Sequence, residues 1–183
     1  KFSIKRGYYN SEISVSITTE TEGAAIRYTT DGSAPDASTG TLYSEPVTVN
    51  STTILRAIAY KAGYKSTNVD TQSYLFAADI KNQSDMDGNV VNDPAYSATI
   101  EDDLSGNLPA ISLVLEEASF FGPNGTHTNY NLSGRGAEIP VSMEFFNPLD
   151  PDDEFQVDAG IRIHGGNARS HPKKPFRLYF RSE

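Results

Sequence analysis

The stretch that decides the fold is TTILRAIAY, residues 52–60. Its apolar side chains fall on both faces of an extended chain, which predicts a central β-strand. Upstream, apolar and hydroxyl residues alternate in ISVSI (13–17), the two-residue period of a half-buried strand. Two further apolar runs are AAIRYTT (24–30) and TQSYLF (71–76). Short strands separated by turn residues predict a β-sandwich over residues 1–78.

Four stretches follow each other in this part of the chain: IRYTTDGSAP (26–35), LYSEPVTV (42–49), TTILRAIAYKAGYKST (52–67) and TQSYLF (71–76). Together they resemble the Ig-like module found at the C-terminus of chitobiase and β-hexosaminidase enzymes. The resemblance implies an Ig-like β-sandwich that serves as an accessory domain in its relatives and is not their catalytic part.

The tyrosines of this module have two interpretations. They form either a platform on which sugars stack, or core and cross-strand positions whose hydroxyls reach the surface. The chain has no Trp, a preferred stacking surface, and this favours the second interpretation. The residues concerned are Tyr28, Tyr43, Tyr60 and Tyr74.

Residues 79–107 are acidic and polar, and they predict an ordered linker. Asp93 stands where a helix N-cap is expected, directly before Pro94 at the first helical position. A short helix is therefore predicted over residues 96–104.

No metal site is predicted. The chain has no Cys, which excludes a disulfide framework, a Cys-based zinc site and a thiol nucleophile. Asp85, Asp87 and Asn89 alternate like the first ligands of a calcium-binding loop. The glycine, however, falls at loop position four instead of six, and position twelve is Tyr96 instead of a bidentate Glu.

Residues 108–183 are β-rich again, so the predicted fold class is mostly β. The predicted elements are strands at 109–115, 139–146, 155–164 and 175–181, a helical turn at 116–121 and a loop at 121–136.

The charge of the chain is unevenly distributed. The net charge is −9, from 15 basic and 24 acidic residues, which argues against a nucleic-acid partner. Residues 159–182 nevertheless contain six cations, two histidines and no acid. Two interpretations of this segment stay open: it holds an anion, or it is a basic strand pair complemented by the acids of residues 79–103.

Three stretches stand out in the second half: DMDGNVVNDPAYSATIEDDLSGNLPAISLVLEEASFFGPNG (85–125), IPVSMEFFNP (139–148) and FQVDAGIRIHGGNARSHPKKPFRLYFR (155–181). In this order they resemble the spore-coat CotH kinase-like family. The resemblance implies an atypical protein-kinase fold that transfers phosphate from ATP to protein side chains. Residues 108–183 then correspond to a β-rich (α+β), truncated N-terminal part of that kinase-like domain.

The same resemblance implies a nucleotide-phosphate site between the last two strands. Two glycines and an arginine form a phosphate-facing turn, a lysine reaches the phosphates, and an arginine and a histidine line the same face. In that order, these residues are Gly165, Gly166, Arg169, Lys173, Arg162 and His164. Glycines let backbone N–H groups approach an anion closely, and Lys or Arg supplies the charge.

One observation opposes this site, and one alternative interpretation of its lysines stays open. Ala168 stands where the family often has Ser, which removes one hydroxyl donor. A solvated surface is the alternative interpretation of Lys173 and Lys174.

The acidic metal-binding and catalytic residues of the family lie downstream of this sequence. The chain is therefore expected to be a fragment without catalytic residues, metal ligands or cofactor, and ATP and Mg²⁺ are expected only in a full-length parent protein. That parent is expected to be a secreted or cell-surface bacterial protein kinase of atypical fold.

The alternative function is an extracellular carbohydrate-binding or structural module without nucleotide chemistry. Expected partners are other domains of the same polypeptide and a protein substrate or cell-surface polysaccharide. No run of 18 apolar residues is present, so no membrane span is predicted.

Overall fold

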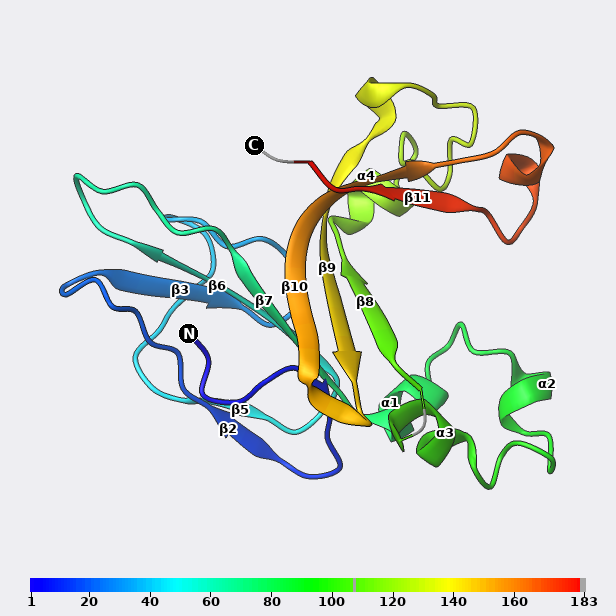
Figure 1. Ribbon diagram of the computed structural model, residues 1–183, viewed down its shortest axis with the longest axis horizontal. Helices are drawn as coiled ribbons and strands as arrows, with labels where there is room; N and C mark the ends of the chain where they lie inside the picture. Colours follow the sequence, from blue (N-terminus) through cyan, green and yellow to red (C-terminus); the bar gives the residue numbers. More distant parts are fainter. Residues whose placement is uncertain (107, 182–183) are drawn as a thin grey trace. The chain divides into compact units, whose positions relative to one another are not determined.

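The computed structural model describes residues 1–106 and 108–181, and its fold is mostly β (Figure 1). The described strands form sheets of five, two and four strands. In spatial order, the five-stranded sheet consists of β1 (Gly7–Tyr8), β7 (Asp70–Leu75), β6 (Thr53–Tyr60), β3 (Ala25–Thr29) and β4 (Thr41–Leu42). The two-stranded sheet consists of β2 (Ile13–Val15) and β5 (Val47–Val49). The four-stranded sheet consists of β11 (Phe176–Tyr179), β10 (Asp150–Ile163), β9 (Ile139–Asn147) and β8 (Ala110–Val114).

The helices are short. The α-helices are α1 (Ala77–Lys81), α2 (Gly88–Val91), α3 (Ile100–Gly106) and α4 (Glu117–Phe121), and the 3-10 helices are η1 (Arg135–Ala137) and η2 (Asn167–Ser170). Across residues 1–106 and 108–181, no helix is long and apolar enough to cross a membrane.

The chain divides into two compact units. The first unit consists of Lys1–Ser112 and Glu144–Phe155, and the second unit consists of Leu113–Met143 and Gln156–Glu183. The division of the sequence into a module at 1–78, a linker at 79–107 and a partial lobe at 108–183 stays a prediction.

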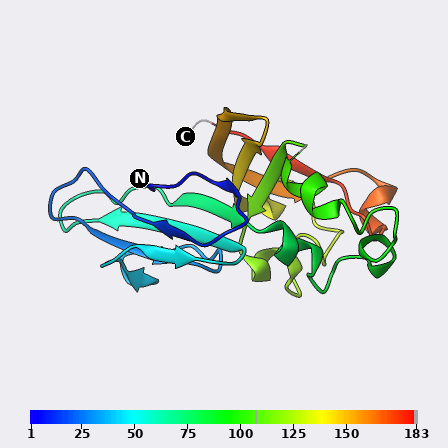
Figure 2. The ribbon, with the colours of Figure 1, turned by 90° about the horizontal axis from the view of Figure 1, so that it is seen from below.

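The first unit has the core of a β-sandwich. Strand β6 lies between β7 and β3, which confirms the central strand predicted from its two apolar faces. The β2–β5 pair contributes Val15 and Val49 to the buried core, which also contains Leu55 of β6 and Tyr74 of β7. Figure 2 shows the ribbon of these strands from a second direction. Antiparallel pairing of β2 with β5 places Val15 opposite Val47, so both sheets turn an apolar face inward.

A buried ion pair covers the edge of β7 where its partner strand ends. Strand β1 pairs with β7 only at Tyr74 and Leu75. Beyond that point, Glu144 of β9 accepts hydrogen bonds from the backbone N–H of Ser73 (3.0 Å) and from the Ser73 hydroxyl. Arg6 forms an ion pair with the same carboxylate, with 3.4 Å between Arg6 Nε and Glu144 Oε1. The pair thus satisfies polar groups that an uncovered strand edge would leave open.

The helix predicted over residues 96–104 starts one turn too early. The Asp93 side chain accepts a hydrogen bond from the N–H of Ala95, two residues on (2.8 Å), so it forms a local turn. Turns continue until the N–H of Ile100 bonds the carbonyl of Tyr96 (2.9 Å), and α3 begins at Ile100. A side-chain N-cap is present at a different helix, α2, where the Asp87 carboxylate accepts a hydrogen bond from the N–H of Asn89.

The strands predicted in the second half are confirmed, and one boundary differs by more than two residues. Strand β10 begins at Asp150 instead of residue 155, so it is 14 residues long. A tight connection after β9 explains the early start, because the Asn147 side chain accepts from the N–H of Leu149 (3.0 Å). The helical turn predicted at 116–121 is present as α4.

Candidate functional site

Strands β10 and β11 form a hairpin with two different faces. Their antiparallel register pairs Ile161 with Leu178 and Ile163 with Phe176. Side chains alternate along a strand, so these four apolar residues share one face. Ile161 and Ile163 are buried there, and Phe176 contacts the ring of Phe120 from α4, with 5.0 Å between centroids.

The opposite face of the hairpin, which we name the basic face, carries arginines and a tyrosine. It consists of Arg162, His164, Arg177, Tyr179 and Arg181, at alternate positions of the two strands and their extensions. Arg162 donates from Nε to the Tyr179 hydroxyl (2.7 Å), and its guanidinium lies 4.4 Å from the ring centroid. Arg181 lies 5.1 Å from the same ring. Such cation–π contacts are attractive because the ring face is electronegative.

Arg177 and His164 interact at the end of the basic face nearest the connecting turn. Arg177 Nη2 and His164 Nε2 are 2.7 Å apart. Arginine can only donate, so His164 Nε2 is the acceptor of this hydrogen bond. The N–H of His164 bonds the carbonyl of Pro175 (2.9 Å), which extends the hairpin ladder beyond β10.

The turn that follows exposes backbone donors. Gly165 has a φ of +93°, a left-handed conformation that favours glycine, and an added Cβ at Gly166 would meet nothing within 4 Å. Both glycines are exposed. Within residues 1–106 and 108–181, their N–H groups donate to no partner. Exposed, unpaired N–H groups in a turn are donors that an anion can accept from.

The two lysines after this turn have different environments. Lys174 donates from Nζ to the carbonyl of His171 (3.0 Å) and lies 5.3 Å from the ring centroid of Tyr130. Lys173 is exposed, and no described residue pairs with it. Lys173 is therefore the lysine available to a ligand, and Lys174 is a structural cation.

Arg169 is turned toward another loop. Its Nη2 donates to the carbonyl of Leu132, and its Nε is buried without a partner in the described part of the chain. The guanidinium therefore links the glycine turn to the loop around residue 132. The sequence-predicted residues Arg162, His164, Gly165 and Gly166 follow each other at the end of the strand, and Arg169 reaches away from them.

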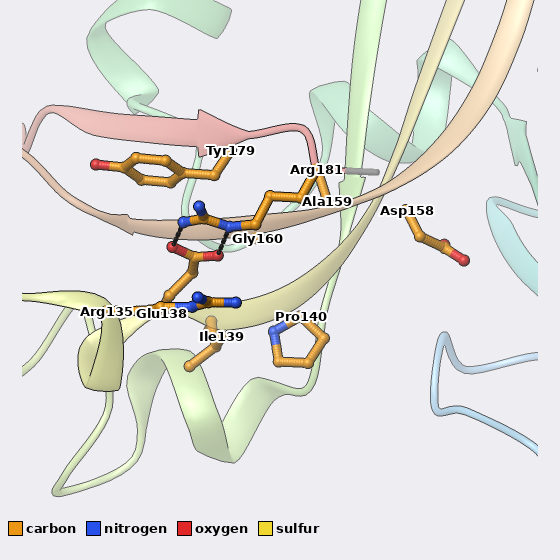
Figure 3. A pocket seen from close by; sticks show the side chains of 9 residues that line it. All are labelled: Arg135, Glu138, Ile139, Pro140, Asp158, Ala159, Gly160, Tyr179 and Arg181. Carbon is orange, nitrogen blue, oxygen red and sulfur yellow. Dashed lines mark hydrogen bonds and ion pairs between the residues drawn. The ribbon is translucent and has the colours of Figure 1, made fainter. Parts of the chain in front are cut away.

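Glu138 is the acid that pairs with the basic face among the described residues (Figure 3). Arg181 donates to it twice, from Nη2 to Oε2 (2.6 Å) and from Nε to Oε1 (3.1 Å). The bonds from Arg181 hold the pKa of Glu138 below its usual range, and the charges of Arg162 and Arg135 act in the same direction.

Sequence reasoning missed Arg177, Tyr179 and Glu138 as parts of this site. The strand register was needed to see that Arg177 lies opposite Arg162 and that Tyr179 lies opposite Gly160. One signal was available in the sequence, because Gly160 interrupts a strand pattern and such a glycine often marks a close approach of other atoms.

The four tyrosines considered as a sugar platform, Tyr28, Tyr43, Tyr60 and Tyr74, lie in core or cross-strand positions. Tyr74 is fully buried. Tyr28 and Tyr43 pack against the core and meet edge to face, with 6.3 Å between centroids. The Tyr60 hydroxyl accepts from Arg27 Nε (3.2 Å). The interpretation of these residues as core and cross-strand positions is confirmed.

Comparison with known proteins finds one match. Residues 4–71 match the family model of the chitobiase/β-hexosaminidase C-terminal domain. No curated protein and no solved structure matches the chain. The match agrees with the resemblance stated for the first 78 residues and with a mostly β fold that is consistent with an Ig-like sandwich.

Proposed function

We propose that residues 108–181 are the phosphate-holding N-terminal part of a CotH-type kinase-like domain, carried on a secreted or surface-exposed bacterial protein. The Ig-like module serves as its accessory domain. The observation that carries this proposal is the exposed turn at Gly165 and Gly166, with free N–H groups and the unpaired Lys173 nearby in the chain.

The chemistry of this turn suits phosphate oxygens. Two free N–H groups supply directed donors, and Lys173 supplies a mobile positive charge. No acid occurs between residues 159 and 181, so nothing within this segment competes with a phosphate for these donors. The basic face continues the positive charge along the hairpin, which attracts an anion to an otherwise acidic chain.

Phosphoryl transfer also needs carboxylates that hold Mg²⁺ and a base that positions the acceptor hydroxyl. Among the described residues, no group of three or more His, Cys, Asp or Glu side chains is arranged to hold a metal ion. The role proposed for this part of the chain is contact with the nucleotide phosphates. ATP, Mg²⁺ and the protein substrate belong to the full-length parent.

The test is thermal stabilisation by ATP in Lys173→Ala, with Lys174→Ala as the matched control. Ligand at ten times its Kd stabilises the folded state by about 1.4 kcal/mol, a rise in Tm of about 3–6 °C for a chain of this size. We expect this rise in the unmodified protein and in Lys174→Ala, and its loss in Lys173→Ala. Adenosine should give no rise, because it lacks phosphates. An ATP-dependent rise that survives in Lys173→Ala would contradict the proposal.

A second function, glycan binding by the first unit, is favoured by two neighbouring hollows of about 460 and 500 Å³. Both are lined by Tyr8, Tyr9 and Ser105, and Glu101 and Glu154 lie at their polar walls. Aromatic walls with a few polar groups are the usual lining of small-molecule sites and suit sugar rings. The match to a carbohydrate-associated domain supports this candidate.

Retention on chitin or cellulose tests the second function. Tyr8→Ala should abolish retention if the hollows hold the glycan, and Tyr64→Ala, at an exposed tyrosine outside them, should leave it unchanged. Equal loss in both variants would exclude these hollows as the binding site. Secretion of the protein is supported by the occurrence of chitobiase C-terminal domains in extracellular glycosidases.

A further inference from the structure

The basic face has a second site at the end away from the glycine turn. A pocket of about 420 Å³ opens there, and its charged walls are Arg135, Glu138, Asp158 and Arg181 (Figure 3). Its floor is the Gly160–Tyr179 pair, three residues along β10 from the Ile163–Phe176 pair next to the turn. At about 3.3 Å per residue, the pocket floor is about 10 Å from the end of β10, and the glycine turn begins two residues beyond that end.

Gly160 makes room for an acidic side chain in this pocket. A Cβ at this position would overlap the Glu138 carboxylate. The missing side chain leaves bare backbone on the basic face, and the Glu138 carboxylate lies on it. Strand β10 is therefore shaped to hold a carboxylate at this point.

The Glu138 carboxylate lies next to two arginines of the pocket wall. Arg181 binds Glu138 through two hydrogen bonds, and the charge of Arg135 also lowers its pKa. The lining contains two arginines, Arg135 and Arg181, and two acids, Glu138 and Asp158. Figure 3 shows the Asp158 side chain pointing away from the Glu138–Arg181 pair, so of these two acids Glu138 is the one that lies beside both arginines.

Arg135 is the guanidinium that is still available. It is exposed, and it has no hydrogen-bond or ion-pair partner among residues 1–106 and 108–181. In Figure 3, the Glu138 carboxylate lies between the guanidinium groups of Arg181 and Arg135, and only Arg181 bonds to it. A planar guanidinium matches a carboxylate in a two-pronged geometry, so Arg135 offers a second copy of the arrangement that Arg181 already shows.

The neighbouring backbone favours an extended peptide as the carrier of the incoming carboxylate. Glu138 itself is presented by extended backbone, with φ −83° and ψ 126°. Strand β11 is the outermost strand of its sheet, so its outer edge has backbone groups open to an added strand. Tyr179 of this edge strand lines the pocket, which places the free edge and the free guanidinium at the same site.

We propose that this pocket binds an acidic side chain of an extended protein segment, with Arg135 as the primary contact and with Glu138 as an internal competitor for Arg181. Glu138 occupies Arg181 when the segment is absent. An incoming carboxylate pairs with Arg135 first. It also pairs with Arg181 when the hydrogen bonds between Glu138 and Arg181 open.

The test is fluorescence anisotropy with a labelled hexaglutamate peptide, with hexaglutamine as the uncharged control. Arg135→Ala should weaken hexaglutamate binding about threefold to fivefold, the usual effect of an exposed charge pair. Glu138→Gln should strengthen binding, because the amide releases Arg181 and removes a negative charge. Lys173→Ala should bind the peptide normally even where it loses ATP, so the two proposals fail separately.

Circular dichroism and Tm confirm that each variant folds before its affinity is compared. Equal affinity in Arg135→Ala and the unmodified protein would overturn the proposal, as would weaker binding in Glu138→Gln. Displacement of the peptide by inorganic phosphate at equal concentration would show a general anion site and would overturn the assignment to an acidic peptide.

Discussion

The two units each contain an Arg–Glu pair, and the two pairs have opposite environments. In the first unit, the side chains of Arg6 and Glu144 are 8% and 0% exposed. In the second unit, those of Arg181 and Glu138 are 43% and 13% exposed. Burial raises the pKa of Glu144 despite its hydrogen bonds, and the bonds from Arg181 lower the pKa of Glu138. For the pKa of Glu144, desolvation has a larger effect than the ion pair. For the pKa of Glu138, the ion pair has a larger effect than desolvation.

This difference separates a structural pair from an exchangeable one. Glu144 holds a strand edge through Ser73 and has no exposed surface, so no outside group can take its place. Glu138 lies in an open pocket beside a free guanidinium, so an outside acid can compete with it. The same two residue types therefore stabilise the fold in one unit and regulate access to a site in the other.

The largest expected effect is that of breaking the buried pair. Glu144→Ala leaves Arg6 as a buried, unpaired charge and leaves the Ser73 N–H without an acceptor. We expect the free energy of unfolding to fall by about 3–5 kcal/mol. Urea unfolding measures this fall, and Glu138→Ala is the matched control, which should change stability little. Equal losses in the two variants would show that the pairs are not different in kind.

An intermediate effect is expected from Gly160→Ala. The new Cβ overlaps the Glu138 carboxylate, so the Glu138–Arg181 pair must open or the strand must shift. The overlapping atoms belong to the end of a flexible side chain, so the free energy of unfolding should fall by about 1 kcal/mol, the lower end of the range for overpacking. The pKa of Glu138 should also rise toward its ordinary value as its bonds to Arg181 are lost, which NMR titration of the carboxyl measures. A Glu138 pKa that stays low in Gly160→Ala would show that the pair does not depend on the bare strand.

A smaller, pH-dependent effect has opposite signs for the two glutamates. The pKa of Glu144 is raised in the folded state, so its contribution to stability is complete below pH 4.5 and is lost as pH rises above that value. The pKa of Glu138 is lowered, so its contribution is present above pH 4.5 and is lost as pH falls below it. Stability measured from pH 3 to 8 in Glu144→Gln and Glu138→Gln, each against the unmodified protein, should show these opposite trends. Trends of the same sign would contradict the assigned causes.

The sequence predicts strands well in this chain and predicts the pairs poorly, for a physical reason. Strand β6 is recognisable because its apolar residues report burial on both faces. The partners of Glu144 are not recognisable, because Ser73 lies 71 residues away and nothing local marks the contact. The predicted start of helix α3 was wrong because the Asp93 side chain accepts a hydrogen bond within a local turn. The N-cap sequence pattern does not exclude this alternative.

The candidate site was predictable only along the strand. The segment from Arg162 to Gly166 was predicted as a block because its residues follow each other in sequence, and its role stays a prediction. The difference between Lys173 and Lys174 depends on which carbonyl and which ring each one meets, and the sequence does not contain that information. Arg169 likewise depends on its contact with Leu132 in a distant loop.

The most direct test of the central claim, that the glycine turn holds phosphate, is an amide NMR titration with tripolyphosphate. The account predicts that the N–H signals of Gly165 and Gly166 shift on addition of the ligand, and that Lys173→Ala weakens this shift while Lys174→Ala preserves it. Shifts that spare both glycines, or that persist unchanged in Lys173→Ala, would contradict the account.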